Sequence, residues 1–440
     1  MFSAGQIAVL NAVQVKALTT AQVPVLDDTQ LGAFTKTQIG YFEKTDLAEF
    51  TTTQIGLLTT DQMEGLTVNQ MPGLTEAQAG SLSTTQLAAL NGSQVKAFEA
   101  TDFAALSTTQ LAIFNATQMA ALTATLLATL DETEVQGLNV TQVAALQATQ
   151  IKGLSETQLV ALDTQISAMT TTQIRSLTAT QIGLLSDTQV AALTATQLGA
   201  LTTAQMQGLE AADIQGLATS QISGFTATQI KGLSTTAVAA LYDTQVAVLT
   251  ATALGGMTAT QIGSINATYI SDLTITQLEG LTSTQIKGLT ATQVTEFTTT
   301  QIAALTTTQV SGLQTTDMAG LTTTQVGALT VTQIAALAAT QIKEIDSAAL
   351  ALLTTGQIGA ITTTQIKGLS TSISALTSTQ LGVLTATQIG AFTATQIGLL
   401  STTTVSGLTT AQLGGLSMTQ MKALSAGQLG ALTEIGRAHV

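Results

Sequence analysis

Side chains that could perform catalysis are almost absent from this sequence of 440 residues. There is no Cys, and the one His is His439, near the end of the chain. Nucleophilic catalysis needs a base beside a Ser, Thr or Cys, and a metal site needs clustered His, Cys or carboxylate ligands. Acidic residues are scattered, and Asp27 and Asp28 are neighbours only by chance. We therefore expect that the chain is not an enzyme and has no catalytic residue, no cofactor-binding residue, no metal ligand and no cofactor.

The charge and hydropathy pattern argues against two classes of partner. Nucleic-acid recognition needs a basic stripe that neutralises phosphates, but the 12 Lys and Arg residues are spread thinly in a chain of net charge −14. Thr and Gln interrupt every apolar stretch well before the roughly 18 residues that a membrane-spanning helix requires. We predict no nucleic-acid partner and no membrane span. Cell-surface contacts and self-association stay open, and no partner is certain.

An octapeptide repeat runs through the chain. From Thr53 the sequence is TQIGLLTT, DQMEGLTV, NQMPGLTE, and so on. The consensus is T-x-T-Q-Φ-x-a-Φ, where Φ is a large apolar residue, a is usually small, and the first Thr is position 1. It gives about 54 octads in all. Two repeats, at Leu162–Gln165 and Leu369–Ser372, lack one residue between the Leu and the Gln position. That segment therefore behaves as a loop, and the Gln-to-Leu segment as the ordered element.

Positions 1 and 4 together predict a helix start in every octad. Thr at position 1 is often replaced by Ser, Asn or Asp, which are the residues that cap a helix N-terminus. Position 4 is Gln in most octads and a carboxylate in five. Ser or Thr followed three residues later by Gln or Glu is the capping box. The carboxylates that replace Gln are Asp46, Asp102, Glu134, Asp213 and Asp317.

The spacing of the apolar positions decides between continuous and interrupted elements. Eight residues overshoot a whole number of helical turns by about 80°, so one long helix would smear its apolar stripe. Spacings of three and five would alternate the faces of a strand. We predict an all-α solenoid or superhelix of about 54 short capped helices of one to two turns, one per octapeptide. Gly at positions 6 and 7, and Pro24 and Pro72, favour partly 3₁₀ helices. The alternative is a β-solenoid with two octads per coil, because Thr, Ile and Val favour strands.

Two repeated polar patterns have simple structural explanations. The Asn-x-Ser/Thr sequons begin at Asn91, Asn115, Asn139 and Asn266, and each Asn is expected to be a helix cap. The T-x-T phrase resembles the Thr arrays of insect β-solenoid ice-binding proteins. However, the first Thr is exchanged for Asp, Asn and Ser, which capping allows and a flat methyl-bearing face does not.

Basic residues prefer one position of the octad. Nine of the twelve occupy position 6: Lys16, Lys96, Lys152, Arg175, Lys231, Lys287, Lys343, Lys367 and Lys422. Several are seven octads apart, as in the series from Arg175 through Lys231 and Lys287 to Lys343. Duplication of a seven-octad block, or chance, is the favoured interpretation. The other is a superhelix that returns to the same face every seven octads, so that the charges line up for lateral contacts.

The organisation predicted is a single continuous octapeptide-repeat solenoid over residues 1–434, which starts and ends in mid-array. Phe2 already stands at position 8, and Ser3 to Gln6 form a full capping segment. Residues 435–440, Ile-Gly-Arg-Ala-His-Val, break the repeat and resemble the translation of a sequencing adapter. We expect this tail, with His439, to be non-native, in a sequence assembled from environmental reads. Any signal or anchor would lie outside the fragment.

The phrase L-T-x-x-Q-Φ-x-x-L resembles the Thr/Gln-rich octad arrays of very large bacterial surface or secreted repeat proteins, which are often called adhesin-like. This resemblance implies a structural spacer or stalk located outside the bacterial cell or on its surface. The phrase also looks like the helix opening of the DNA-reading repeats of plant-pathogen effectors, but the base-reading residues and basic charge are missing here. The alternatives are a solenoid that binds a protein, a polysaccharide or ice, and a filament that self-assembles through uncapped ends.

Overall fold

The computed structural model describes residues 2–438, with side chains through residue 432. It contains 49 α-helices and four 3₁₀-helices, and no strand occurs over these residues. The all-α prediction is confirmed and the β-solenoid is excluded. Nearly all the α-helices have four to six residues, and the exception is α49, with 13. The chain forms two compact units, Met1–Gly224 and Phe225–Val440, which are described separately.

The helices of each unit follow the octads one by one. Those of the first unit are α1 (Ala4–Ile7), α2 (Ala12–Lys16), α3 (Asp28–Gly32), α4 (Lys36–Ile39), α5 (Lys44–Glu49), α6 (Thr52–Leu57), α7 (Thr60–Gly65), η1 (Met71–Gly73), α8 (Glu76–Ser81), α9 (Thr84–Ala89), α10 (Gly92–Lys96), α11 (Ala100–Phe103), α12 (Thr108–Leu111), α13 (Ala116–Ala121), α14 (Ala124–Leu127), α15 (Glu132–Gln136), α16 (Val140–Ala145), α17 (Ala148–Lys152), α18 (Glu156–Ala161), η2 (Asp163–Ala168), α19 (Thr171–Ser176), α20 (Ala179–Gly183), α21 (Asp187–Ala192), α22 (Ala195–Gly199), α23 (Thr203–Met206), α24 (Ala211–Gly216) and α25 (Thr219–Ile222).

Those of the second unit are α26 (Ala227–Gly232), α27 (Thr235–Ala239), α28 (Asp243–Ala247), α29 (Ala251–Gly255), α30 (Ala259–Ser264), η3 (Ala267–Asp272), α31 (Ile275–Glu279), α32 (Ser283–Lys287), α33 (Ala291–Thr295), α34 (Thr299–Ala304), α35 (Thr307–Val310), α36 (Thr315–Gly320), α37 (Thr323–Gly327), α38 (Val331–Ala336), α39 (Ala339–Ile342), α40 (Ser347–Leu352), α41 (Thr355–Gly359), α42 (Thr363–Gly368), η4 (Ser370–Ala375), α43 (Ser378–Gly382), α44 (Ala386–Gly390), α45 (Ala394–Leu399), α46 (Thr402–Val405), α47 (Thr410–Gly414), α48 (Met418–Lys422) and α49 (Ala426–Ala438).

The predicted capping box starts most of these helices. In α6 the Gln54 N–H donates to Thr51 Oγ1 at 3.2 Å, and the Thr51 N–H donates to Gln54 Oε1 at 2.9 Å. The helix ends where Leu58, at position 8, adopts an extended backbone, and Thr59 continues it until the next helix starts. Two extended residues therefore form the turn between octads, and each cap satisfies N–H groups that a short helix would otherwise leave unpaired.

Departures from the α-helix have individual causes in the sequence. The octad 19–26 forms only turns, because Pro24 removes the N–H that a second helical bond would use. Pro72 shortens its octad to the 3₁₀-helix η1, and Tyr269 stands at the Gln position of η3. The two seven-residue repeats form η2 and η4.

The missing residue of each seven-residue repeat is absorbed at the predicted loop. There Asp163 (φ 44°) and Ser370 (φ 38°) directly follow the position-8 Leu, and within residues 2–438 they are the non-Gly residues with positive φ. One left-handed residue thus replaces part of the two-residue extended turn, at a modest cost in backbone strain. The structure confirms that length changes are taken up between Leu and Gln.

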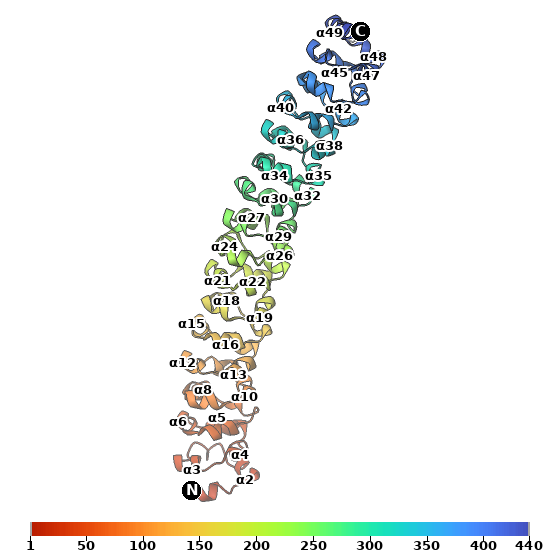
Figure 1. Cartoon of the computed structure of the whole chain (residues 1–440). Coiled ribbons are helices and arrows are strands. Elements are labelled where there is room, and N and C mark those ends of the chain that lie inside the picture. Colours follow the sequence, from red (N-terminus) through yellow and green to blue (C-terminus); the bar gives the residue numbers. More distant parts are fainter. Residues whose placement is uncertain (1, 439–440) are drawn as a thin grey trace. The chain divides into compact units, whose positions relative to one another are not determined.

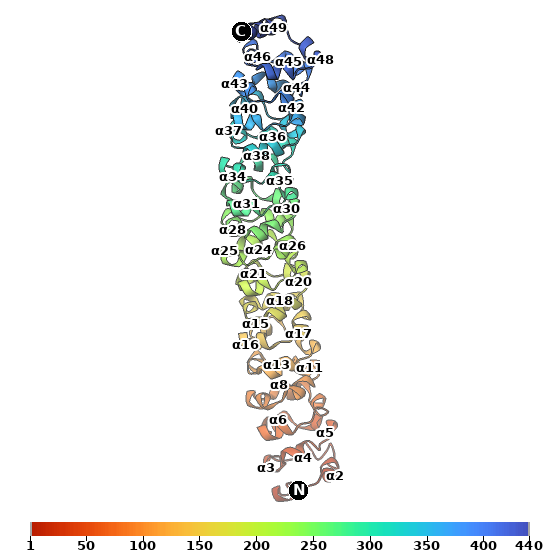
Figure 2. The same ribbon diagram turned by 45° about the vertical axis from the view of Figure 1, so that its right-hand side comes forward.

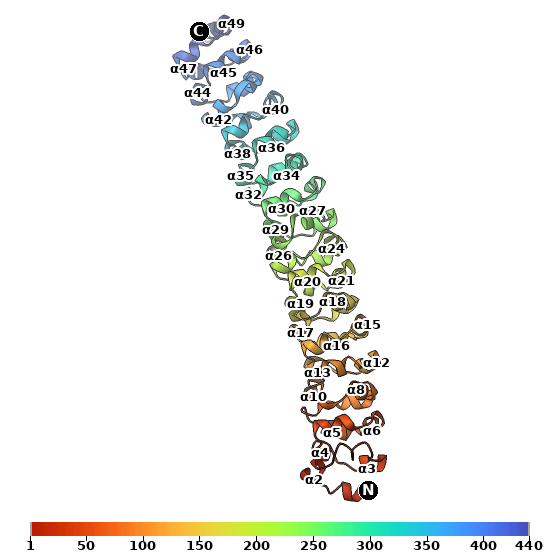
Figure 3. The same ribbon diagram turned by 180° about the vertical axis from the view of Figure 1, so that it is seen from behind.

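Within each unit the helices stack in successive turns of the chain (Figure 1, Figure 2 and Figure 3). Most helices pack on the helix three octads earlier, as α13 does on α10 and α16 on α13. The two Φ positions point inward in most octads, and Ile55 and Leu58 are 0% and 3% exposed. The core is therefore a column of small layers, each of which is buried by its neighbours.

Small residues at position 7 allow this close stacking. A Cβ added to Gly288 would lie 2.5 Å from the Ala259 carbonyl oxygen, and one added to Gly256 would lie 2.6 Å from that of Ala227. In both cases position 7 meets position 2 of the octad three earlier. This close approach explains why Gly is used at position 7 despite its weak helix propensity.

Candidate functional site

The repeated Gln at position 4 is the most consistent polar feature of the fold. Its Oε1 accepts from the N–H of the capping residue, and its Nε2 donates to two backbone carbonyls of an earlier layer. Gln86 donates to the Ile55 and Leu58 carbonyls at 2.7 and 2.9 Å. Gln205 donates to those of Ile174 and Leu177, both at 2.8 Å. The acceptors lie 31 and 28 residues earlier, at positions 5 and 8 of the octad four before.

One amide therefore joins two levels of the structure. It starts its own helix and also donates to two carbonyls at the C-terminal end of a helix beneath it. The position-5 carbonyl of each pair, such as that of Ile55, also accepts the N–H of position 8. We call this set of side chains the glutamine ladder. Most of its members are buried, and Gln189, for example, is 0% exposed. Buried amides with both ends bonded fix one register between layers, because a shifted layer would leave donors and acceptors unpaired.

The capping role of the Gln at position 4 was predicted from the sequence, but its bonds to the carbonyls of an earlier layer were not. A signal was available. A capping box accepts Glu as readily as Gln, and the positive end of a helix dipole favours Glu. Yet Glu stands at position 4 only in Glu134. That preference indicates that the side chain must donate as well as accept, which an amide does and a carboxylate does not.

Four aspartates replace Gln in the ladder, and all are buried: Asp46, Asp102, Asp213 and Asp317. Each loses the donor that the carbonyls beneath would receive. Burial raises the pKa of all four carboxyls, and that of Asp213 reaches about 6. Oδ2 of Asp102 and Oδ1 of Asp317 are buried with no hydrogen-bond partner. These positions are local weak points of the ladder.

The other residues that the sequence singled out are helix caps. Asp27 Oδ1 accepts from the Gln30 N–H at 2.8 Å. The Asn of a sequon accepts from backbone N–H groups, as Asn115 does from those of Thr117 and Gln118. Thr hydroxyls at position 1 are engaged in the same way. Capping thus accounts for the sequons and for the first Thr of the T-x-T phrase.

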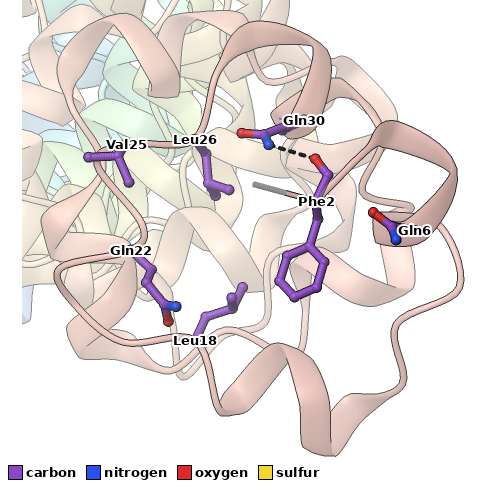
Figure 4. A pocket seen from close by; sticks show the side chains of 7 residues that line it. All are labelled: Phe2, Gln6, Leu18, Gln22, Val25, Leu26 and Gln30. Carbon is purple, nitrogen blue, oxygen red and sulfur yellow. Dashed lines mark hydrogen bonds between the residues drawn. The ribbon is translucent and has the colours of Figure 1, made fainter.

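A hollow with a volume of about 540 Å³ lies in the first octads (Figure 4). Its walls are apolar side chains and Gln amides, and the Gln30 Nε2 donates to the Phe2 carbonyl at 2.7 Å across its rim. No titratable group lines it: the residues are Phe2, Gln6, Leu18, Gln22, Val25, Leu26 and Gln30. This hollow therefore offers packing surface but no chemistry.

Two features are absent from the part of the chain that the structure describes. No cluster of three His, Cys, Asp or Glu side chains lies where it could hold a metal ion among the side chains described. None of the helices described is long and apolar enough to cross a membrane. His439, and the side chains of the predicted non-native tail 435–440, lie outside the described residues.

Residues 163–195 match a family model described as the ALTTAQ repeat. The match covers η2 and α19 to α21, and it supports the assignment of a repeat protein. No curated protein matches the chain. One solved structure, described as "Structure of APUM23-GGAAUUGACGG", is 12% identical over 98% of this chain and 95% of that chain, with a TM-score of 0.17. At that score the likeness carries no argument about fold or function.

Proposed function

We propose that the chain is a structural spacer, the stalk or repeat region of a large bacterial surface or secreted adhesin-like protein, and that it performs no catalysis and binds no nucleic acid. The glutamine ladder is the observation that supports this most directly. The same interlayer bonds repeat through each unit. Such repetition keeps many layers in register and does not build one distinct recognition site. The extracellular location rests on the resemblance of the octad to such arrays.

The repetition makes length the property that such a protein can vary most easily. A turn of the superhelix takes three to four octads, since the helix contacts span three and the Gln bonds span four. Stacked helices lie roughly 8–10 Å apart. Each added turn should therefore lengthen a folded array by roughly this amount, whereas a flexible linker lengthens only with the square root of its residue number.

The test is to place arrays of increasing octad number between a membrane anchor and a binding head on bacterial cells. Capture of large particles by the head should rise in proportion to octad number. Gly/Ser linkers of the same residue number are the matched control, and they should give a weaker, saturating rise. Capture that is independent of octad number, or equal for arrays and linkers, would contradict the spacer function.

A further inference from the structure

The seven-octad spacing of basic residues corresponds to two turns of the superhelix. In the second unit, α29 packs on α26, which carries Lys231. Gln285 at the start of α32 then donates to the Leu254 and Met257 carbonyls of α29, both at 2.8 Å. The first step spans three octads and the second spans four. Lys287 at the end of α32 is thus brought two layers above Lys231.

The same two steps recur along each unit. The helix α35 packs on α32, and Gln341 of α39 donates to the Val310 and Leu313 carbonyls at the end of α35. Lys343, which directly follows α39, therefore lies two layers above Lys287. In the first unit α13 packs on α10, and Gln150 of α17 donates to two carbonyls at the end of α13. Lys96 of α10 lines the same surface hollow as Gln147 and Gln150. Basic side chains therefore recur on one face.

An ion pair shows directly that seven octads return to one face. Lys44 Nζ lies 3.5 Å from Glu99 Oε1, although the residues are 55 positions apart and stand in octads seven apart. The interpretation that a superhelix aligns the basic residues therefore has a geometric basis, whatever the origin of the repeat. We call the aligned side chains the basic edge: Lys96, Lys152 and Arg175 in the first unit, and Lys231, Lys287, Lys343, Lys367 and Lys422 in the second. All are exposed.

Acidic residues form a second line. In the first unit, α18 packs on α15 and α24 packs on α21, while Gln189 of α21 donates to the Leu159 and Val160 carbonyls of α18. The exposed carboxylates on these helices are thereby stacked, and Asp187 and Glu210 are close enough to contribute to the raised pKa of Asp213. In the second unit η3 packs on α28 and α33 packs on η3, Gln325 of α37 donates to the Thr295 and Phe297 carbonyls at the end of α33, and α40 packs on α37. We call the exposed carboxylates on these helices the acidic edge: Glu132, Glu156, Asp187 and Glu210 in the first unit, and Asp243, Asp272 and Asp346 in the second.

The two edges lie on opposite sides of each unit. Helices of the acidic edge stand two octads from helices of the basic edge, as α15 does from α17, α28 from α26 and α40 from α42. Two octads are just over half a turn. Within the first unit, Figure 1 shows α15, α18, α21 and α24 on one side and α10 and α19 on the other; within the second, α40 lies opposite α42. Figure 3 shows the same separation from behind.

We propose that copies of this chain assemble side by side, with the basic edge of one copy against the acidic edge of the next. The same superhelix sets the spacing of both edges, so within each unit two parallel copies match in period. A free anionic polymer would explain the basic edge but not the acidic edge opposite to it. Since each copy uses two different faces, the contact is heterologous and stays open to further copies.

The strength of such a contact comes from repetition. Two turns of stacked helices span roughly 16–20 Å, which exceeds the Debye length of about 8–10 Å at moderate salt. Neighbouring pairs therefore act almost independently, and each exposed pair is weak. Many weak contacts in register add to one measurable association. The basic residues are available for it, because Lys152, Arg175, Lys231 and Lys287 have no ion-pair partner among the side chains described.

The experiment measures the weight-average mass of the full chain by sedimentation equilibrium at low and high salt. The edge variant carries Lys152→Gln, Lys231→Gln, Lys287→Gln and Lys343→Gln. The matched control carries Lys44→Gln with Ala144→Glu, Ser223→Glu and Ala335→Glu, three exposed position-6 sites on or just after helices that bear no charge. Both variants have a net charge of −18, four below the −14 of the parent chain. Circular dichroism melts verify that each is folded.

The parent and the control should rise above the monomer mass of 44.8 kDa with concentration at low salt and return to it at high salt, while the edge variant stays monomeric throughout. A third variant, with Glu156, Asp243, Asp272 and Asp346 each changed to Lys, should be monomeric alone but associate when mixed with the edge variant carrying Glu in place of Gln. A parent chain that stays monomeric at every concentration and salt overturns the proposal. Equal loss in the control, or binding of dextran sulfate by the basic edge without self-association, also overturns it.

Discussion

At the scale of single residues, the Gln amide both accepts and donates hydrogen bonds, which no other side chain of its length can do. It must accept one bond from the start of its own helix and donate two to the layer beneath. Glu has the same shape but cannot donate, and its charge would face carbonyl oxygens. The few carboxylates at position 4 are therefore informative. They show that the fold can lose the bonds donated to the layer beneath at a few octads.

We expect Gln189→Glu to destabilise the chain by about 2–4 kcal/mol, because the buried Leu159 carbonyl and the partly buried Val160 carbonyl lose a donor and a buried charge is introduced. Gln189 is 0% exposed and donates to the Leu159 carbonyl at 2.9 Å. The control is Gln181→Glu, at a half-exposed position where the two donated bonds are 3.2 and 3.4 Å long. It should cost less than about 1 kcal/mol, since water can replace such bonds. Urea unfolding measures both. Equal losses would show that the interlayer bonds contribute little.

Because four aspartates are buried, we predict that the free energy of unfolding decreases as pH rises. Burial raises the pKa of Asp213 in the folded state from 3.8 to about 6, and it raises those of Asp46, Asp102 and Asp317 in the same direction. The stabilisation from protonation is complete below pH 3.8 and is lost as pH passes through the folded-state value near 6. Thermal midpoints should therefore be higher at pH 4.5 than at pH 8. The variant with Gln at all four positions should show a much smaller difference, and an unchanged difference would refute the assignment.

At the scale of the element, stacking distance is set by what stands at position 7. Gly288→Ala should destabilise the second unit by about 1–3 kcal/mol, because the new Cβ would lie 2.5 Å from the Ala259 carbonyl and the layers must separate. Gly327→Ala is the matched control at the end of α37, where nothing lies within 4 Å of the new Cβ. That change should stabilise by about 0.5–1 kcal/mol through better helix propensity. Urea unfolding compares the two, and shifts of the same sign would contradict this account.

The short helix was predictable because its signals are local. Position 1 caps, position 4 completes the box, and the Leu of position 8 ends the helix, as in α6. The partners of Gln54, 31 and 28 residues earlier, were not predictable. An eight-residue period indicates only that the octads are equivalent. It does not indicate which octads contact each other in the folded chain. The number of octads per turn depends on how Leu and Gly pack between layers, and that is a property of the assembled stack.

At the scale of the whole molecule, stability should depend on neighbouring layers and not on any single octad. If the octads are equivalent, the fold should tolerate the deletion of one whole octad. If residues 290–297 are removed, Gln301 comes to stand four octads after the octad of Ile262 and Ile265. It can then take the carbonyls to which Gln293 donated at 2.9 and 2.7 Å. Every later Gln keeps acceptors of the same kind, and Asp317 comes to stand over the Leu278 and Leu281 carbonyls instead of those of Ile286 and Leu289. The number of octads without a side-chain donor above them therefore does not rise.

We therefore expect deletion of residues 290–297 to leave the helical circular dichroism per residue unchanged and to move the melting midpoint by only a few degrees. Deletion of residues 290–293 alone is the control. It removes the cap Thr290 and the ladder residue Gln293 but leaves four residues without a helix start, so layers above and below lose their register. This smaller deletion should lower the midpoint further and broaden the transition. If instead the eight-residue deletion is the more damaging one, the octads are not interchangeable, and the account of the array as a stack of equivalent layers fails.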